Sequence, residues 1–222
     1  MRGKFYLFDW WNEFTSIREL QSKHHCTLTP FIVNNNFNFI NKSMSYIPLI
    51  YAPNDIFRKK AAEVSVVDDA LRKLIDSMFE TLYLAHGVGI GANMVGVLKR
   101  IAIVDIQENN IRTPLTFINP QITWRSDEMQ SYEEASLSFP GISAQISRPK
   151  AIKLTYLDYQ GKPQEMEAEG FLATVIQHEI DYLDGKIYLD YLSKLKRDTL
   201  LRKMQKHVKM HPPHIHTEHC SH

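Results

Sequence analysis

The chain has 222 residues, of which 44% are hydrophobic, and a formal net charge of +1 at pH 7, so it can bury one sizeable core. Near-neutral charge excludes a general attraction to nucleic acid or membrane, no nucleic-acid recognition motif is evident, and no apolar run reaches the roughly 18 residues of a membrane span. Cys26 and Cys220 lie near opposite ends and form no disulfide framework, which favours a reducing, cytoplasmic setting.

Residues 1–43 differ in composition from the rest of the chain. Aromatic residues gather between Phe5 and Phe14, but acidic residues interrupt them and no small-residue cleavage site follows, which argues against a secretory signal. Residues 34–41 form an asparagine and phenylalanine repeat with little capacity to fold. We expect a disordered extension here; a segment that binds a partner or directs targeting is the alternative.

Residues 44–206 carry the predicted domain. Between Asp68 and Ala85, apolar residues recur with helical spacing, which predicts an amphipathic helix that ends before a glycine-rich segment. Short β segments are expected at residues 100–106, 115–124 and 152–158, with a hairpin turn at residues 159–162. A core helix over residues 170–183 follows. Strands followed by a core helix indicate an α+β domain.

The chain ends in a basic helix and a histidine-rich tail. The helix is expected over residues 193–208, where leucines mix with basic residues, and a solvated face is its simplest interpretation. The tail, assigned to residues 207–222 and expected to be disordered, contains His211, His214, His216, His219, Cys220 and His222. Such a composition binds Ni²⁺, Zn²⁺ or Cu²⁺ whatever its purpose.

Residues 177–185 carry the pattern with the clearest chemistry. Two histidines one helical turn apart can hold Zn²⁺ or Fe²⁺, and a glutamate after the first can act as general base on the metal-bound water. His178 and Glu179 fit this arrangement, but Tyr182 stands where the second histidine would be. The helix therefore predicts half of a metal-hydrolase site.

Further motifs make the pattern specific. Residues 87–96 resemble the first motif of the peptide deformylase family, residues 134–141 the second and residues 177–185 the third. The resemblance extends over about residues 47–206. It implies a peptide deformylase-like fold, with small antiparallel sheets around a central motif-bearing helix and a C-terminal helix. It also implies removal of the formyl group from N-terminal formyl-methionine, with formylated peptides or nascent chains as ligands and ribosome contact through the basic C-terminal helix.

The resemblance assigns roles to single positions. An active deformylase has a glutamine in the first motif that polarises the formyl oxygen, a cysteine metal ligand in the second and two histidines in the third. In this chain Met94 stands at the glutamine position, Ser136 at the cysteine position and Tyr182 at the second histidine position. His178 and Glu179 are kept.

Elementary chemistry predicts that these substitutions weaken the site. A serine hydroxyl hardly deprotonates and binds transition metals poorly, while a tyrosine with an ordinary pKa near 10 ligates as phenolate only at a cost. We therefore expect the positional ligands Ser136, His178 and Tyr182 to hold no metal, or to bind Fe²⁺, Zn²⁺ or Ni²⁺ weakly. Met94 donates no hydrogen bond and cannot stabilise an oxyanion.

Substrate positions follow from the same resemblance. The positions whose backbone groups would receive an extended peptide as an added strand are Val88, Gly89, Ala135 and Leu137. The candidate catalytic positions are Glu179, Leu137 and Met94. Phe171 and Val175, one or two turns before His178, match the pocket for the methionine side chain, although ordinary core packing also accounts for them.

Three functions stay open. The favoured one is a deformylase-like protein with an impaired or inactive site, left as a binder of formyl-methionine peptides or without a retained role. The second is a working deformylase with an altered site, and the third is a metal-handling protein that uses its tail. A metal-free pairing of Ser136 as nucleophile with His178 as base is disfavoured, because no carboxylate is evident that would orient the histidine.

Overall fold

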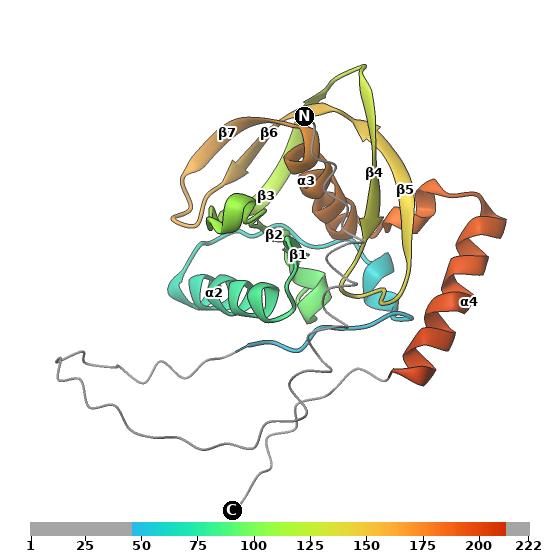
Figure 1. The fold of residues 1–222 in the computed structure, drawn as a ribbon. Coiled ribbons are helices and arrows are strands. Elements are labelled where there is room, and N and C mark those ends of the chain that lie inside the picture. Colours follow the sequence, from blue (N-terminus) through green and yellow to red (C-terminus); the bar gives the residue numbers. More distant parts are fainter. Residues whose placement is uncertain (1–45, 212–222) are drawn as a thin grey trace, which may run out of the picture. The chain divides into compact units, whose positions relative to one another are not determined.

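The computed structural model describes residues 46–211, so the predicted extension over residues 1–43 and residues 212–222 of the tail lie outside the described part. The helices are α2 (Asp69–Leu84), α3 (Gly170–Leu183) and α4 (Lys194–Met210), with 3₁₀ turns η2 (Asp55–Arg58), η3 (Ala92–Val95), η4 (Glu108–Asn110) and η5 (Tyr188–Tyr191) (Figure 1). The strands are β1 (Gly89–Gly91), β2 (Ile101–Val104), β3 (Leu115–Arg125), β4 (Met129–Ala135), β5 (Ser143–Pro149), β6 (Ala151–Leu157) and β7 (Pro163–Glu169).

The strands form two antiparallel sheets around α3. One sheet has five strands in the order β1-β2-β3-β6-β7, and the other is the β4–β5 hairpin. Figure 1 shows α3 between the β6–β7 end of the first sheet and the hairpin. The α+β class predicted from the sequence is confirmed.

The central strand β2 explains where the core lies. Successive side chains of a strand point to opposite faces, and every residue of β2 is buried. Ile101 and Ile103 pack in one hydrophobic cluster with residues of α2, while Ala102 and Val104 pack in a second cluster with residues of α3. The sheet is thus covered by α2 on one face and by α3 on the other.

The end of α3 is set by Gly185. This residue follows the C-cap with a φ of +74°, which costs a glycine little. The N–H of Lys186 donates to the carbonyl of Asp181 at 2.9 Å, and the N–H of Gly185 donates to that of Tyr182 at 3.1 Å. This pattern is a Schellman motif. A side chain at Gly185 would also lie 2.9 Å from the carbonyl oxygen of Arg58.

Most expected elements are present, with some differences. The core helix is observed at Gly170–Leu183 as predicted, and α2, β2, β3 and β6 fall within a few residues of their predicted ranges. No strand was predicted at β1, β4, β5 or β7, although the hairpin turn predicted at residues 159–162 lies between β6 and β7. β7, with the sequence PQEMEAE, is rich in acidic residues that strands disfavour, so its pairing with β6 rather than its propensity forms it.

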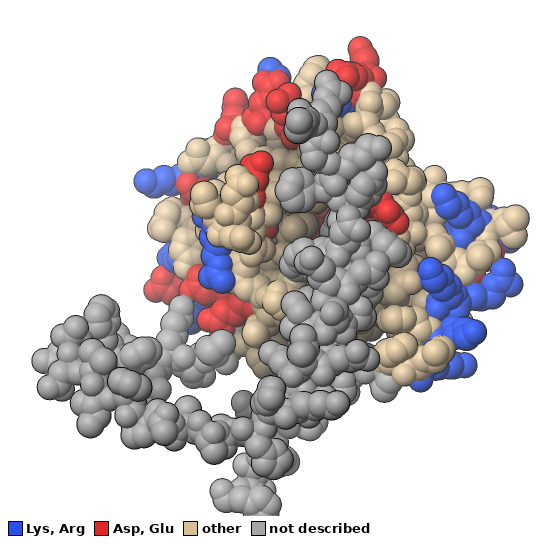
Figure 2. All heavy atoms as spheres, in the orientation of Figure 1, with Lys and Arg blue, Asp and Glu red and all other residues tan. Residues whose placement is uncertain are grey.

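The C-terminal helix is longer than expected. α4 ends at Met210, so residues 207–210, which were assigned to the disordered tail, are helical. Basic side chains cover this helix, as Figure 2 shows. Among the helices of residues 46–211, none combines the length and apolarity that crossing a membrane requires.

Candidate active site

The candidate site is built on the second half of α3. His178, Glu179 and Tyr182 are all buried there, because α3 is enclosed by both sheets. Residues four apart lie on the same face of a helix, which places the rings of His178 and Tyr182 side by side with centroids 5.1 Å apart. The helix therefore presents a histidine and a phenol where two imidazoles would bind a metal.

His178 is oriented by a carboxylate from another element. Its Nδ1 lies 2.8 Å from Oε2 of Glu134, the penultimate residue of β4. A carboxylate accepts hydrogen bonds, so Nδ1 carries the proton. The expectation that no carboxylate orients His178 was wrong. Glu134 is distant in sequence, and only the packing of the β4–β5 hairpin against α3 brings the two together.

Glu134 is also held by a buried guanidinium. Arg148 of β5 donates from Nε to Oε1 of Glu134 at 2.6 Å and from Nη2 to Oε2 at 2.9 Å. Its Nη1 donates to Oδ2 of Asp181 at 2.6 Å, and the hydroxyl of Tyr191 donates to the same oxygen at 2.8 Å. This ion cluster joins β4, β5 and α3 and fixes the carboxylate beside His178.

Burial and pairing shift the pKa values of this cluster. Burial acts to raise the pKa of Glu134, but hydrogen bonds from His178 and Arg148 hold it below its ordinary value. Burial acts to lower the pKa of His178, but the hydrogen bond to Glu134 raises it overall. The arrangement therefore favours a negative Glu134 facing a positively charged or strongly polarised imidazole.

Tyr182 stands at the position of the second histidine and makes a hydrogen bond there. Its hydroxyl donates to Oγ of Ser136 at 2.8 Å, so the residues at two expected ligand positions bind each other. The side chain is fully buried, and burial raises the pKa of the Tyr182 phenol well above its ordinary value. Tyr182 is therefore a neutral phenol near neutral pH.

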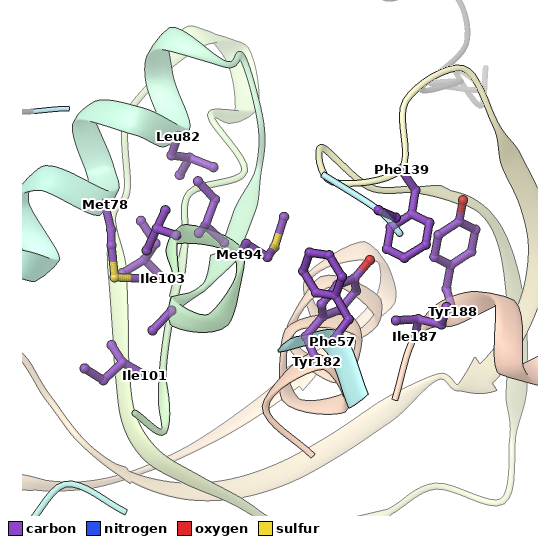
Figure 3. Close-up of a cluster of buried hydrophobic side chains, with 14 of the residues drawn as sticks. Phe57, Met78, Leu82, Met94, Ile101, Ile103, Phe139, Tyr182, Ile187 and Tyr188 are labelled. Carbon is purple, nitrogen blue, oxygen red and sulfur yellow. The ribbon is translucent and has the colours of Figure 1, made fainter. Parts of the chain in front are cut away.

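Aromatic rings surround this pair. The ring of Tyr182 makes edge contacts with Phe57 at 5.8 Å and with Phe139 at 6.4 Å between centroids, and Tyr188 stacks on His178 at 5.7 Å. Figure 3 shows Phe57, Phe139, Tyr182 and Tyr188 together in the core. We call Phe57, Phe139, His178, Tyr182 and Tyr188 the aromatic cluster.

Sequence reasoning missed most of the aromatic cluster. Phe139 lies within the second motif, so its position was a usable signal. Phe57 and Tyr188 lie outside every motif, and nothing in the local pattern separates them from ordinary core residues. Their grouping is decided by tertiary packing.

The donors present do not fit a catalytic transition metal. Such a site normally offers imidazole, thiolate or carboxylate ligands, whereas Tyr182 and Ser136 offer a neutral phenol and a neutral hydroxyl that already bind each other. His178 is the remaining strong donor of the expected set. Within residues 46–211, no group of three or more His, Cys, Asp or Glu side chains is placed to hold a metal ion.

Glu179 points away from His178 and toward the first motif. A side chain at Gly89 would lie 2.6 Å from Oε1 of Glu179, so the carboxyl group packs directly on the β1 backbone. Its Oε2 is buried without a hydrogen-bond partner among the described residues. Burial raises the pKa of Glu179 to about 7, which suits a group that exchanges a proton near neutral pH.

The expected substrate positions fall in two places. Val88, Phe171 and Val175 belong to one hydrophobic cluster, the one that α3 shares with β2. Met94 and Leu137 pack instead in or against the cluster that contains Tyr182. Gly89 lies in β1 and Ala135 is the exposed last residue of β4, so the motifs converge around α3. β1 is a terminal strand of its sheet, paired with β2 on one side.

Comparisons with known proteins agree with this architecture. A family model described as polypeptide deformylase matches residues 47–198. The chain is 60% identical over 183 residues to a protein of Rickettsia conorii named peptide deformylase-like. This match covers 82% of this chain and 100% of the relative. It is 44% identical to peptide deformylase 1 of Pseudomonas syringae, covering 75% of this chain and 99% of the relative.

A solved structure supports the same relationship. The crystal structure of peptide deformylase from Ehrlichia chaffeensis superposes with a TM-score of 0.70 at 38% identity, covering 75% of this chain and 98% of that one. Sequence, motifs and fold therefore agree over most of the chain. We conclude that this chain belongs to the polypeptide deformylase family.

Proposed function

We propose that this protein is a deformylase-family member that does not hydrolyse the formyl group by the metal route and that binds N-terminal formyl-methionine peptides without turnover. The observation that carries the proposal is the hydrogen bond from Tyr182 to Ser136, at 2.8 Å. It joins the two substituted ligand positions, and both groups are neutral hydroxyls, which bind transition metals poorly. The family activity requires ligands that these residues do not supply.

The position of Met94 supports the same conclusion. This side chain is buried, and it packs in the same cluster as Tyr182 (Figure 3). A thioether donates no hydrogen bond, so it cannot stabilise an oxyanion at the formyl carbonyl. Loss of one such donor typically costs about 2.7–4 kcal/mol of transition-state stabilisation. The substitutions thus remove two of the three metal ligands and the oxyanion donor.

Peptide binding does not require the groups that are lost. An added strand is held by main-chain hydrogen bonds, and β1 is a terminal strand with one neighbour. Val88, Phe171 and Val175 share a hydrophobic cluster beside it, which suits the side chain of an N-terminal methionine. These features support retention of the peptide site after loss of the catalytic one.

A peptide titration tests the proposal. The full chain is titrated with formyl-Met-Ala-Ser by calorimetry, and formate release is measured in the same samples. We expect saturable binding with no formate release above that of a no-protein sample. Phe171→Ala should weaken binding, whereas Leu172→Ala, at a half-buried position that packs against the same hydrophobic cluster, should leave it nearly unchanged.

Other outcomes have definite meanings. Formate release that disappears on His178→Ala would support the alternative of a working deformylase with an altered site. Absence of saturable binding by a folded protein would contradict the retained peptide site, and would favour a family member without a retained role in peptide recognition.

Docking to the ribosome through α4 is a further part of the proposal. The exposed basic residues of this helix are Lys194, Lys196, Arg202, Lys203, Lys206 and Lys209. They form a dense positive surface, visible in blue over α4 in Figure 2, which suits an RNA-rich, negatively charged partner in the cytosol. Co-sedimentation with ribosomes should fall when Lys203 and Lys206 are replaced by Glu, and it should fall further as salt is raised.

A further inference from the structure

We infer that His207 and His211, in the last turn of α4, form a bidentate site for a divalent transition metal such as Zn²⁺, Ni²⁺ or Cu²⁺. His207 is helical, and His211 is the C-cap, whose N–H donates to the carbonyl of His207 at 2.8 Å. The two residues are one helical turn apart and lie on the same face. Their rings stack with centroids 4.9 Å apart and an angle of 29° between planes.

This geometry is the one that chelation needs. Two imidazoles one turn apart on a helix reach a common metal ion, each through one ring nitrogen at about 2.0–2.1 Å. The two rings are close but stacked, so they must rotate about their side-chain torsions to direct one ring nitrogen each at a shared ion. The site therefore has an ordered framework and does not depend on the rest of the tail.

A second element fixes the position of one ring. Gly141, which precedes β5 and has a φ of +76°, lies directly against His207, and a Cβ added to it would be 2.5 Å from Cγ of that ring. Only a residue without a side chain fits there. Contact with this loop limits the motion of the His207 ring, so less ordering remains when a metal binds.

The ligand atoms select the kind of ion. Lys203, Lys206 and Lys209 on the same helix repel cations in general. Mg²⁺ and Ca²⁺, which prefer oxygen ligands, find no such ligand in this pair, whereas imidazole nitrogen suits Zn²⁺, Ni²⁺ and Cu²⁺.

The His207–His211 pair determines which variants can test metal binding by the histidine-rich tail. Truncation after Met210 removes His211 together with the tail, so it cannot distinguish the helical pair from the remaining tail donors. Point variants in the full chain can. We therefore use a tail-silent background in which four tail histidines are replaced by Ala and the tail cysteine by Ser: His214, His216, His219, His222 and Cys220.

The experiment titrates the tail-silent protein with NiCl₂ and with ZnCl₂ by calorimetry. We expect one site whose affinity falls by about tenfold or more in His207→Gln and in His211→Gln, since either change removes one arm of the chelate. Lys209→Gln, in the same turn, should not weaken it. In the Cu²⁺ form, electron paramagnetic resonance should report coupling to two imidazole nitrogens in the background and to fewer in either variant.

Two results would overturn the inference. One is a folded tail-silent protein that binds no Ni²⁺ or Zn²⁺ at micromolar concentration. The other is an affinity that His211→Gln leaves unchanged. His211 is exposed, so this variant should fold even if His207→Gln disturbs the contact with Gly141; helix content is checked by circular dichroism.

Discussion

At the scale of single residues, the most consequential substitution is Tyr182. It keeps the size of an aromatic ring in a fully buried position but replaces a metal-binding nitrogen by a hydroxyl that donates to Ser136. The two residues stabilise each other in place of a metal ion. Replacement at both positions leaves no buried hydroxyl of this pair without a partner, which explains how the core tolerates the change.

Tyr182→Phe should lower the free energy of unfolding. The change removes only the hydroxyl and its hydrogen bond to Ser136, so we expect a loss of about 1 kcal/mol in urea unfolding. Tyr188→Phe is the matched control, because its hydroxyl makes a longer contact, 3.4 Å, with the carbonyl of Ile142. An equal or larger loss in Tyr188→Phe would contradict this account of the pair.

Glu179 should make stability depend on pH. Because burial raises its pKa to about 7, the folded state holds a proton that the unfolded state, with an ordinary pKa near 4.3, has released. Its contribution to the free energy of unfolding therefore falls as pH rises from about 4 to above 7. Glu179→Gln should remove this fall and stabilise the protein at pH 8 by on the order of 1–3 kcal/mol, and by less at pH 5.

Urea unfolding at both pH values checks this prediction. Glu63→Gln is the control, because that side chain is exposed and the change should not alter the pH dependence. A gain for Glu179→Gln that is equal at pH 5 and pH 8 would show that the carboxyl group is not buried as a charge at high pH.

At the scale of elements, the β4–β5 hairpin and α3 act as one unit. Arg148 of β5 holds Glu134 of β4 and Asp181 of α3, and Glu134 in turn holds His178. This cluster lies beside the positions at which the resemblance to the family places metal ligands. Its persistence follows from energetics, because removal of one member leaves uncompensated charges in a buried position.

Arg148→Ala should therefore be severely destabilising. Glu134 and Asp181 would lose their main partner while Glu134 stays buried, and breaking such a pair typically costs about 3–5 kcal/mol. Lys150→Ala, two residues along the chain, removes an exposed ion pair with Glu128 and should have little effect. Thermal unfolding of both variants measures the difference, and similar midpoints would contradict the role of the cluster.

At the scale of the whole molecule, the chain keeps the fold of the family, and the proposed function holds that the chemistry of its site is changed. The aromatic cluster packs where ligand positions meet, so stability of the parent protein should not depend on a metal at His178. In the tail-silent background that also carries His207→Gln, a chelator should leave the thermal midpoint unchanged. The same scaffold should accept metal again if the donors are restored.

The variant with Met94→Gln, Ser136→Cys and Tyr182→His tests this. We expect it to bind nearly one additional equivalent of Zn²⁺ or Ni²⁺, to lose that equivalent on His178→Ala, and to release formate from a formyl-methionine peptide. The metal-free variant should be less stable than the parent, because Tyr182→His replaces one ring of the aromatic cluster by a smaller ring. Tyr182→His alone is the control and should bind metal more weakly. Metal in the parent that disappears on His178→Ala would contradict the proposal.

Much of this could be predicted from the sequence. The spacing of apolar residues predicted α2 because helical periodicity is a local property. The motif residues placed α3 and identified the family through their order along the chain. The strands β4 and β7 were not found, because their polar sequences become strands only by pairing with a neighbour. The orientation of His178 by Glu134 was also missed, because 44 residues separate the two partners and only tertiary packing brings them together.

The sequence by itself determined the fold class and the family, since these depend on residue type and spacing, and it supplied the prediction of which residues occupy the site positions. Only the tertiary structure decided that Tyr182 and Ser136 bind each other, that aromatic rings from separate segments pack around them, and that His207 and His211 stack at the end of a longer α4. The physical reason is that such contacts depend on which elements pack together, and packing is set by the whole core rather than by any local pattern.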